Sequence, residues 1–188
     1  MRIVSGSHKG RKIKAPKNLP IRPTTDMSKE SIFNILSNLY EFNEISVIDL
    51  FSGSGNISYE FASRGATNII SVDNNINCIN FIKKTSKELN ININAIKSDV
   101  IIFLKKTAIK SDIIFSDPPY HFDETYLSVM IELVFSKNLI NDNGILIIEH
   151  SKEISLELNQ YFLKKKRYGS CYFTFLKKTK RVSLNTRF

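Results

Sequence analysis

The segment Ser116-Asp117-Pro118-Pro119-Tyr120, directly after the apolar run 113–115, brings a carboxylate, two prolines and an aromatic ring together. Two adjacent prolines remove two backbone N–H donors and stiffen the chain, so carbonyl oxygens stay available as acceptors beside the Asp117 carboxylate. This combination suits a flat heterocyclic base that carries an amino group. The segment is therefore a candidate catalytic corner that orients an exocyclic amine.

Another apolar run leads into residues 49–55, DLFSGSG, which precede a helical pattern. Glycine lets the backbone turn tightly and approach a ligand, and a helix N-terminus supplies free N–H groups. Asp73 lies twenty residues after Gly53, where a carboxylate can accept both hydroxyls of a ribose. Ser98 and Asp99 form a polar pair that can bind an adenine amine. Packing, solvation and helix capping explain these residues equally well, so both interpretations stay open at this point.

Apolar, strand-like runs alternate with helical patterns along the chain. The patterns predict these strands: 46–50, 68–72, 92–97, 111–116, 145–149 after a turn at 141–144, and a last strand or hairpin at 168–176. They predict these helices: 57–64, 76–89, 100–108, 124–135 and 151–160. Such alternation indicates an α/β fold with a mainly parallel sheet covered on both faces. Ligands collect beyond the carboxyl ends of such strands, where the candidate segments fall.

The first 25 residues follow a different pattern. Apolar positions at Ile3 and Ile13 surround turn-prone glycines, which predicts a small two-stranded unit. Asp26 can cap the helix that follows. We therefore expect two parts, a basic N-terminal extension at 1–25 and a main domain at 26–188.

The net charge of +9 is concentrated at the two ends of the chain. Residues 1–22 carry seven Lys or Arg and residues 160–188 carry nine, with no acidic residue in either, whereas residues 23–159 have a net charge of −7. Two basic ends indicate binding of a polyanion such as nucleic acid, provided that they converge in space. A lysine-rich, solvated surface is the alternative.

Length and composition favour one globular unit, because 188 residues match a single domain and 42% of them are hydrophobic. We expect no membrane span and a cytoplasmic location, since no apolar stretch approaches about 18–20 residues. Cys78 and Cys171 are far apart and lack a C-x-x-C partner. They predict neither a disulfide framework nor a metal site, and we interpret both as small buried side chains.

The three motifs at 49–55, Asp73 and 117–120 resemble those of class I S-adenosylmethionine-dependent methyltransferases that modify exocyclic amines. Further segments, spread over nearly the whole chain, are similar to the RsmD family, which methylates guanine N2 in small-subunit (16S) ribosomal RNA. These segments are RIVSG at 2–6, GRK at 10–12, RPTTD at 22–26, Glu30, Phe33-Asn34 and Tyr168-Gly169.

The resemblance implies a Rossmann-like, seven-stranded, mostly parallel sheet with a small N-terminal β-hairpin and helix extension. It implies S-adenosylmethionine as the cofactor, no metal, and a monomer whose partner is ribosomal RNA, within the small subunit. The cofactor contacts would be Asp49, Phe51, Gly53, Ser54, Gly55, Asp73, Asn74, Asp99, Val100 and Asp117. The catalytic residues would be Asp117, Pro118, Pro119 and Tyr120. The RNA contacts would be Lys9, Arg11, Lys12, Lys14, Arg22, Thr24 and Thr25, with the basic run 164–167 as a further candidate.

The sequence departs from the family at three positions. Members commonly carry arginines where Met27 and Lys29 stand, and an acidic residue where Ser170 stands, so we expect weaker RNA contact there.

Three other functions stay open. A DNA adenine-N6 methyltransferase shares the 117–120 motif, but the chain leaves little length for a target-recognition domain. A nicotinamide-dependent dehydrogenase would use the glycines, but the third glycine of its motif is missing. A non-catalytic RNA-binding module would not need an intact Asp117.

Overall fold

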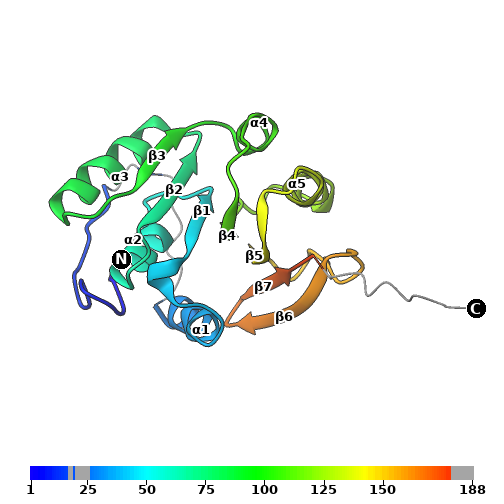
Figure 1. The fold of residues 1–188 in the computed structure, drawn as a ribbon, viewed down its shortest axis with the longest axis horizontal. Coiled ribbons are helices and arrows are strands. Elements are labelled where there is room, and N and C mark those ends of the chain that lie inside the picture. Colours follow the sequence, from blue (N-terminus) through cyan, green and yellow to red (C-terminus); the bar gives the residue numbers. More distant parts are fainter. Residues whose placement is uncertain (17–18, 20–25, 179–188) are drawn as a thin grey trace, which may run out of the picture.

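The structure is a computed structural model that describes residues 1–16, 19 and 26–178 (Figure 1). Its centre is a seven-stranded sheet in the order β3-β2-β1-β4-β5-β7-β6. The strands are β1 (Ser46–Leu50), β2 (Asn68–Asp73), β3 (Asn94–Lys97), β4 (Ser111–Ser116), β5 (Ile140–His150), β6 (Phe162–Tyr168) and β7 (Cys171–Leu176). The first five pair in parallel and the last two are antiparallel. This confirms the predicted α/β, mostly parallel, Rossmann-like sheet.

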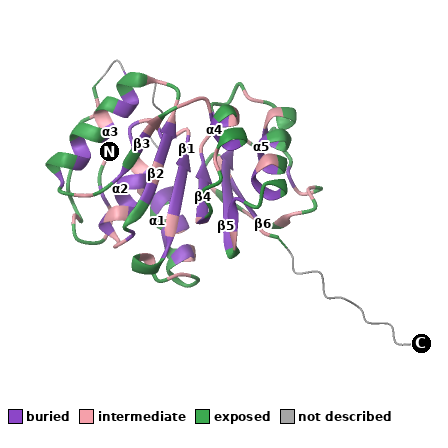
Figure 2. Cartoon of the chain, turned by 45° about the horizontal axis from the view of Figure 1, so that its top comes forward, coloured by how far each residue is buried: buried purple, intermediate pink, exposed green. Residues whose placement is uncertain are grey.

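Helices cover both faces of the sheet. They are α1 (Asp26–Ser37), α2 (Asn56–Ser63), α3 (Ile76–Glu88), α4 (Val100–Lys106) and α5 (Glu124–Ser136), with a short 3-10 helix, η1, at Phe42–Glu44. The helices α1, α2 and α3 lie on one side of the sheet and α4 and α5 on the other (Figure 1), and the central strands between them are buried (Figure 2). Apolar side chains of α1, α2 and α3 join one core cluster, and those of α4 and α5 join the other. Successive strand residues point to opposite faces, so Val47 belongs to the first cluster and Ile48 to the second. This explains the continuous apolar runs in the sequence.

The N-terminal segment forms a small antiparallel unit that folds back along α2. Arg2 pairs with Lys12 in a single bridge, and Ile3 and Ile13 are buried in the first core cluster. The tip of the unit reaches the far ends of α2 and α3, because the Ser7 N–H donates to the Ser63 carbonyl at 2.7 Å and the His8 ring lies 2.9 Å from the Leu89 carbonyl. The predicted two-stranded unit is therefore present, and it packs on the main body.

A buried ion pair fastens this segment to the helices. The Glu60 side chain on α2 accepts the backbone N–H groups of Val4 and Ser5, at 2.8 and 3.0 Å. It also lies 3.5 Å from the Lys29 ammonium and 2.9 Å from the Arg64 Nε. Burial lowers the pKa of Lys29, and the charge of Glu60 opposes that shift. Lys29 is fully buried, so its side chain offers no surface to RNA, and the departure from arginine at this position does not alter an exposed contact.

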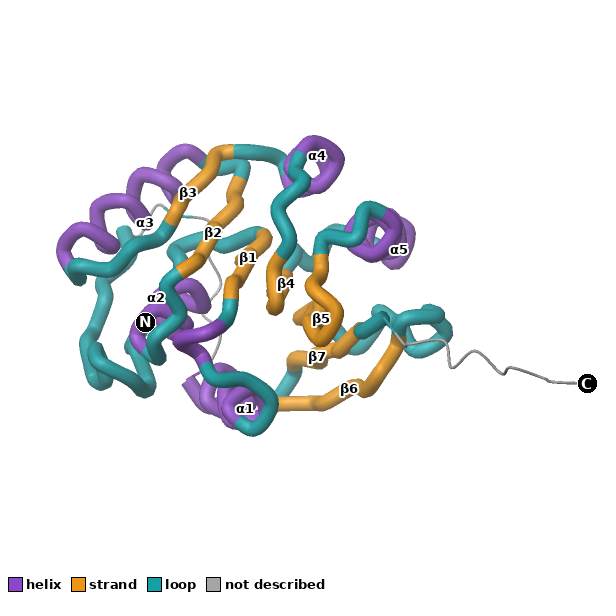
Figure 3. Tube along the Cα trace, viewed as in Figure 1, coloured by secondary structure: helices purple, strands orange, loops and turns teal. Residues whose placement is uncertain are grey.

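Three differences from the predicted elements lie in the second half of the chain. Residues 151–160 form turns instead of a helix, and Figure 3 draws this connection between β5 and β6 as a loop. The predicted turn at 141–144 lies inside β5, where the register with β4 shifts. The terminal hairpin begins at Phe162, six residues before the predicted start. Across the part of the chain that the structure describes, each helix is too short or too polar to span a bilayer.

Candidate functional site

A cavity of about 770 Å³ lies beyond the carboxyl ends of β1, β2, β3 and β4. Its size is within the range of pockets that enclose a cofactor or drug-sized ligand. The segments that follow these four strands supply its lining: Asp49, Phe51, Ser52, Gly53, Ser54, Asn56, Ile57, Asp73, Asn74, Asn75, Cys78, Asp99, Val100, and every residue from Asp117 to Phe122. We call residues 49–55 the glycine loop and residues 117–120 the diproline corner. They are more than 60 residues apart in the sequence, yet both contribute side chains or backbone to this one cavity.

The predicted cofactor residues line this cavity, with one exception. Gly55 is the residue before α2 and has φ +80°, which an L-residue with a side chain rarely adopts. A Cβ built on it would lie 2.9 Å from the Ile82 side chain and 2.9 Å from the Tyr59 ring. Gly55 thus allows the glycine loop to pack against α2 and α3, while Gly53 and Ser54 line the cavity.

A Gly55→Ala substitution should lower the free energy of unfolding by more than about 2 kcal/mol, because left-handed strain and a side-chain clash add together. Gly10→Ala provides the matched control, since Gly10 has φ +83° and a Cβ on it would meet no other atom within 4 Å. It should cost only the strain, about 1–2 kcal/mol. Urea denaturation of both variants measures the difference, and equal losses would contradict the proposed packing role of Gly55.

Asp49 is a buried carboxylate at the end of β1. Its Oδ2 accepts the Ser58 hydroxyl at 2.6 Å and the Ser58 N–H at 3.2 Å, and the Ser58 hydroxyl also lies 2.6 Å from that of Ser71. Burial raises the pKa of Asp49 to about 7, although the hydrogen bonds from Ser58 oppose the shift and the charge of Asp73 adds to it. A cationic ligand group would restore the charged form.

Two other carboxylates fix the shape of the cavity. Asp73 accepts the Gly53 N–H on one oxygen and the Asn75 N–H on the other, both at 2.8 Å. Each oxygen keeps a second lone pair for a ligand. Asp99 caps α4 by accepting the Ile102 N–H at 2.9 Å, and it also lines the cavity. Both interpretations of Asp99 that the sequence left open, helix cap and pocket residue, therefore fit its position.

The diproline corner follows β4 directly. The Asp117 N–H lies 3.4 Å from the Leu50 carbonyl, so the corner is joined to the strand that carries the glycine loop. Pro118 is buried, and the Phe122 N–H donates to the Pro119 carbonyl at 3.1 Å. The Tyr120 ring is about half exposed, and its hydroxyl lies 3.6 Å from the Cys171 sulfur on the terminal hairpin. Cys78 is buried as expected, whereas Cys171 is only partly buried.

Phe51, a predicted cofactor residue, and Phe122, which the sequence analysis did not single out, form an aromatic wall of the site. Phe122 stacks on Tyr126 of α5 with centroids 3.9 Å apart, and Phe51 lies 5.7 Å from Phe122. Phe51 has φ 56°, so its ring projects from a strained turn. Further lining residues were also missed: Ser52, Asn56, Ile57, Asn75, Cys78, His121 and Phe122. They directly follow or neighbour recognised motif residues, and that adjacency was the available signal.

The predicted RNA contacts are only partly brought to the cavity. Lys9 is at the tip of the N-terminal unit, beside the far ends of α2 and α3, whereas exposed Lys12 pairs with Arg2 nearer the cavity. Arg11 and Lys14 are exposed on the same segment. The remaining three predicted contacts lie outside the described residues: Arg22, Thr24 and Thr25. Met27 and Ser170 are exposed.

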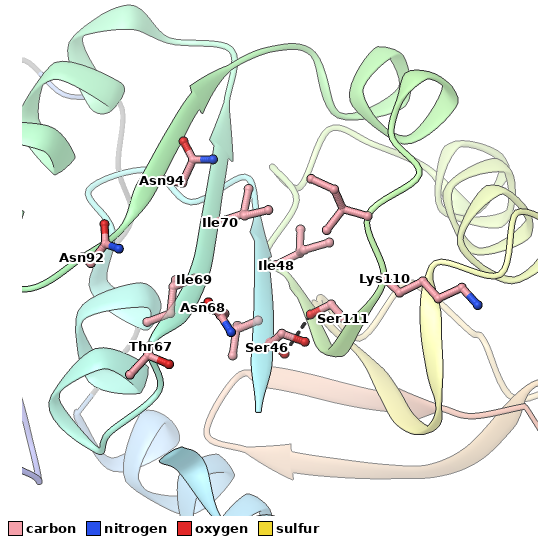
Figure 4. Close-up of a pocket in the computed structure, with 12 residues that line it drawn as sticks. Ser46, Ile48, Thr67, Asn68, Ile69, Ile70, Asn92, Asn94, Lys110 and Ser111 are labelled. Carbon is pink, nitrogen blue, oxygen red and sulfur yellow. Dashed lines mark hydrogen bonds between the residues drawn. The ribbon is translucent and has the colours of Figure 1, made fainter. Parts of the chain in front are cut away.

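A second hollow of about 490 Å³ lies at the opposite edge of the sheet (Figure 4). Its lining includes Ser46, Asn68, Asn94 and Ser111, which stand at the amino ends of their strands. The Ser111 hydroxyl donates to the Ser46 carbonyl at 2.8 Å there. None of the predicted site residues lines this hollow. In the described ranges, His, Cys, Asp and Glu side chains do not gather in threes at a possible metal site.

Known proteins resemble this chain over most of its length. The model of the family described as "Conserved hypothetical protein 95" matches residues 1–177. A ribosomal RNA small subunit methyltransferase D of Buchnera aphidicola is 38% identical, over 82% of this chain and 80% of that protein. The putative rRNA methyltransferase YlbH of Bacillus subtilis is 34% identical, over 83% of this chain and 85% of its own.

The solved structures include a putative methylase, HI0767 of Haemophilus influenzae. It superposes with a TM-score of 0.75 and 26% identity, over 93% of this chain and 96% of that one. This similarity agrees with the observed α/β fold. Because the family model spans residues 1–177, the chain belongs to the Conserved hypothetical protein 95 family, which is the RsmD family that its motifs resemble.

Proposed function

We propose that this protein transfers a methyl group from S-adenosylmethionine to the exocyclic N2 of a specific guanine in small-subunit ribosomal RNA. One observation carries the proposal: the glycine loop, two carboxylates suited to a nucleoside, and the diproline corner line the same cavity. The names of relatives at 34% and 38% identity, an rRNA methyltransferase and a ribosomal RNA small subunit methyltransferase, support the choice of substrate. With this substrate, a cytoplasmic location follows.

The donor set of the cavity fits S-adenosylmethionine. The buried Asp49 carboxylate suits the ammonium group of its methionine part, next to the turn at Gly53. Asp73 retains lone pairs for the ribose hydroxyls, and Asp99 and Val100 stand where an adenine would lie. When bound, the cofactor supplies an electrophilic methyl group on a sulfonium.

The corner would act on the target amine. The lone pair of a guanine amino group is delocalised into the ring, so the amine is a weak nucleophile. The Asp117 carboxylate and the Pro118 carbonyl would accept hydrogen bonds from its two N–H groups and turn the lone pair toward the methyl group, while Tyr120 stacks on the base. As the N–C bond forms, the bond between sulfur and methyl would break, S-adenosylhomocysteine would leave, and the extra proton on the nitrogen would pass to solvent. Rate would come mainly from alignment, which contributes about 7–11 kcal/mol in well-oriented reactions.

A paired guanine inside a helix cannot enter this cavity, so the target would be unpaired or flipped out of its stack. The basic extension at 1–25 would bind the RNA backbone, because its exposed cations Arg11, Lys12 and Lys14 lie along one segment. The remainder, 26–188, would be the methyltransferase domain. The protein would act as a monomer on the small ribosomal subunit.

Cofactor affinity should fall as the pH decreases from 7.5 to 5.5. Burial raises the pKa of Asp49 to about 7, so in the free protein its carboxylate becomes protonated below that pH and the proton competes with the ammonium group. The loss should approach tenfold per pH unit below about 7. Calorimetric titration with S-adenosylmethionine measures it, and Asp49→Asn should bind weakly with little pH dependence. A wild-type affinity that is constant or rises at low pH would contradict this role.

Nucleoside analysis tests the proposal as a whole. The purified protein is incubated with S-adenosylmethionine labelled on the methyl group and with small ribosomal subunits from cells that lack the protein. We expect the label in N2-methylguanosine at a single position of the small-subunit RNA. Label in N6-methyladenosine would favour the amino group of adenine as the target, and no label in any nucleoside would reject RNA methylation.

A further inference from the structure

The edge strand β6 carries four consecutive cations, Lys164, Lys165, Lys166 and Arg167. Three of these cations make cation–π contacts with aromatic rings of β7, which orient them but do not neutralise their charge. The Lys164 ammonium lies 4.8 Å from the Phe175 ring centroid, and Lys165 and Arg167 lie 5.2 and 5.7 Å from that of Tyr172. Glu157 pairs with Lys165, and no acidic residue occurs from 160 onward. The strand is therefore an ordered, strongly positive edge.

The strongly basic end of β6 lies at the same edge of the sheet as the cavity. His150, the last residue of β5, pairs with Tyr172 of β7, which in turn pairs with Arg167. The turn of the hairpin then reaches the diproline corner, because the Cys171 sulfur lies 3.6 Å from the Tyr120 hydroxyl. The exposed cations Lys166 and Arg167 therefore lie next to the hairpin turn that contacts the corner, where the target base would be held.

The N-terminal segment reaches the other side of the same cavity. The Ser54 hydroxyl, which lines the cavity, lies 3.3 Å from the Met1 sulfur. Arg2 is the next residue in the chain, and Lys12 pairs with it in the antiparallel bridge. Parts of the two basic ends therefore lie on opposite sides of the cavity, Arg2 and Lys12 beside the glycine loop and Lys166 and Arg167 beside the diproline corner.

We propose that the β6–β7 hairpin is a second RNA-binding surface, which holds backbone phosphates on the corner side of the target nucleotide. The RNA strand would cross the mouth of the cavity from the N-terminal segment to the hairpin, so that the guanine between the two holding points enters beside Tyr120. This inference rests on the proposed function, because it takes ribosomal RNA as the polyanion. Lysines on an edge strand also prevent pairing with other sheets, and the experiment has to separate these two roles.

The test compares two double variants. Lys166→Gln with Arg167→Gln removes the hairpin cations, and Lys105→Gln with Lys106→Gln removes two exposed cations from the last turn of α4 as a matched control. Affinity for small ribosomal subunits from cells lacking the protein is measured at several salt concentrations. We expect the hairpin variant to bind about tenfold more weakly at low salt, with a logarithmic salt slope reduced by about two. Affinity for S-adenosylmethionine should stay unchanged, and so should both RNA parameters of the control.

Several outcomes would overturn this inference. They are an unchanged salt slope in the hairpin variant, an equal loss in the α4 control, and aggregation of the hairpin variant with unchanged RNA affinity. The single variant Lys166→Gln, at an exposed side chain, should reduce the slope by about one and guards against a folding defect in the double variant. If the wild-type protein itself fails to bind small subunits, the proposed function fails and not the assignment of the hairpin alone.

Discussion

An Asp117→Ala variant should lose methyl transfer by at least about 10²–10³-fold while its binding of S-adenosylmethionine stays measurable. The carboxylate stands at the start of the diproline corner, where it would accept a hydrogen of the target amine and hold the lone pair in line. Alanine removes that acceptor but leaves Pro118 and Pro119 to shape the corner. Initial rates of methyl transfer and calorimetric titration with the cofactor measure the two effects separately.

Asp142→Ala is the matched control for this variant, because Asp142 is an exposed acidic residue at the amino end of β5, away from the cavity. It should leave both the rate and the cofactor affinity unchanged. Near-normal turnover in the Asp117 variant would reject the positioning of the amine by this carboxylate. Loss of cofactor binding in proportion to the rate would instead make Asp117 a cofactor residue only.

Lys29→Met should lower the free energy of unfolding by about 3–5 kcal/mol, the usual cost of removing one partner from a buried ion pair. The side chains of Lys29 and Glu60 are both fully inaccessible to solvent. The ammonium also donates to the Arg2 carbonyl and, at 3.0 Å, to the Asn56 side chain. Methionine fills a similar volume without a donor, so these acceptors and the Glu60 charge lose a partner. Urea denaturation monitored by circular dichroism measures the change.

Lys84→Met is the control for this effect. Lys84 and Glu88 form another Lys–Glu pair, with side chains that are 75% and 58% exposed and 3.9 Å apart. Its loss should cost less than about 1 kcal/mol because solvent screens the charges. Lys29→Arg, which introduces the residue common in the family, should stay folded and retain most of the stability. Equal losses at Lys29 and Lys84 would show that the buried cluster does not anchor the N-terminal segment.

The parts of the fold that follow from local pattern were predicted correctly. Strands such as 111–116 are continuous apolar runs because both faces of the sheet are buried, and the motifs at their ends mark the cavity. The positions of Asp49, Asp73, Asp99 and Asp117 around one cavity follow from the rule that parallel strands end at the same edge.

The incorrect predictions have physical causes that local pattern does not contain. In the loop 151–160, Leu156 is buried and Leu158 fully exposed, and the Ser155 N–H donates to Glu124 of α5. These tertiary contacts replace the helix that periodicity suggested. Strand β6 was missed because an edge strand with four cations and two partly exposed faces shows no apolar alternation.

Two packing roles could not be predicted from the sequence. The structure places Lys29 in a buried ion pair and Gly55 in close packing against Tyr59, while a contact between Gly55 and the cofactor stays a prediction. Residue type and motif membership could not separate ligand contact from packing. Only the arrangement of α1, α2 and α3 around the glycine loop does so.

A crystal structure with S-adenosylhomocysteine, the product left after methyl transfer, would show where the cofactor lies relative to the diproline corner. We predict that this molecule lies in the cavity beyond β1, β2, β3 and β4, with its amino group at Asp49, its ribose at Asp73 and its sulfur facing Asp117. Binding in the hollow at the amino ends of the strands, or with the sulfur turned away from the 117–120 corner, would contradict the account.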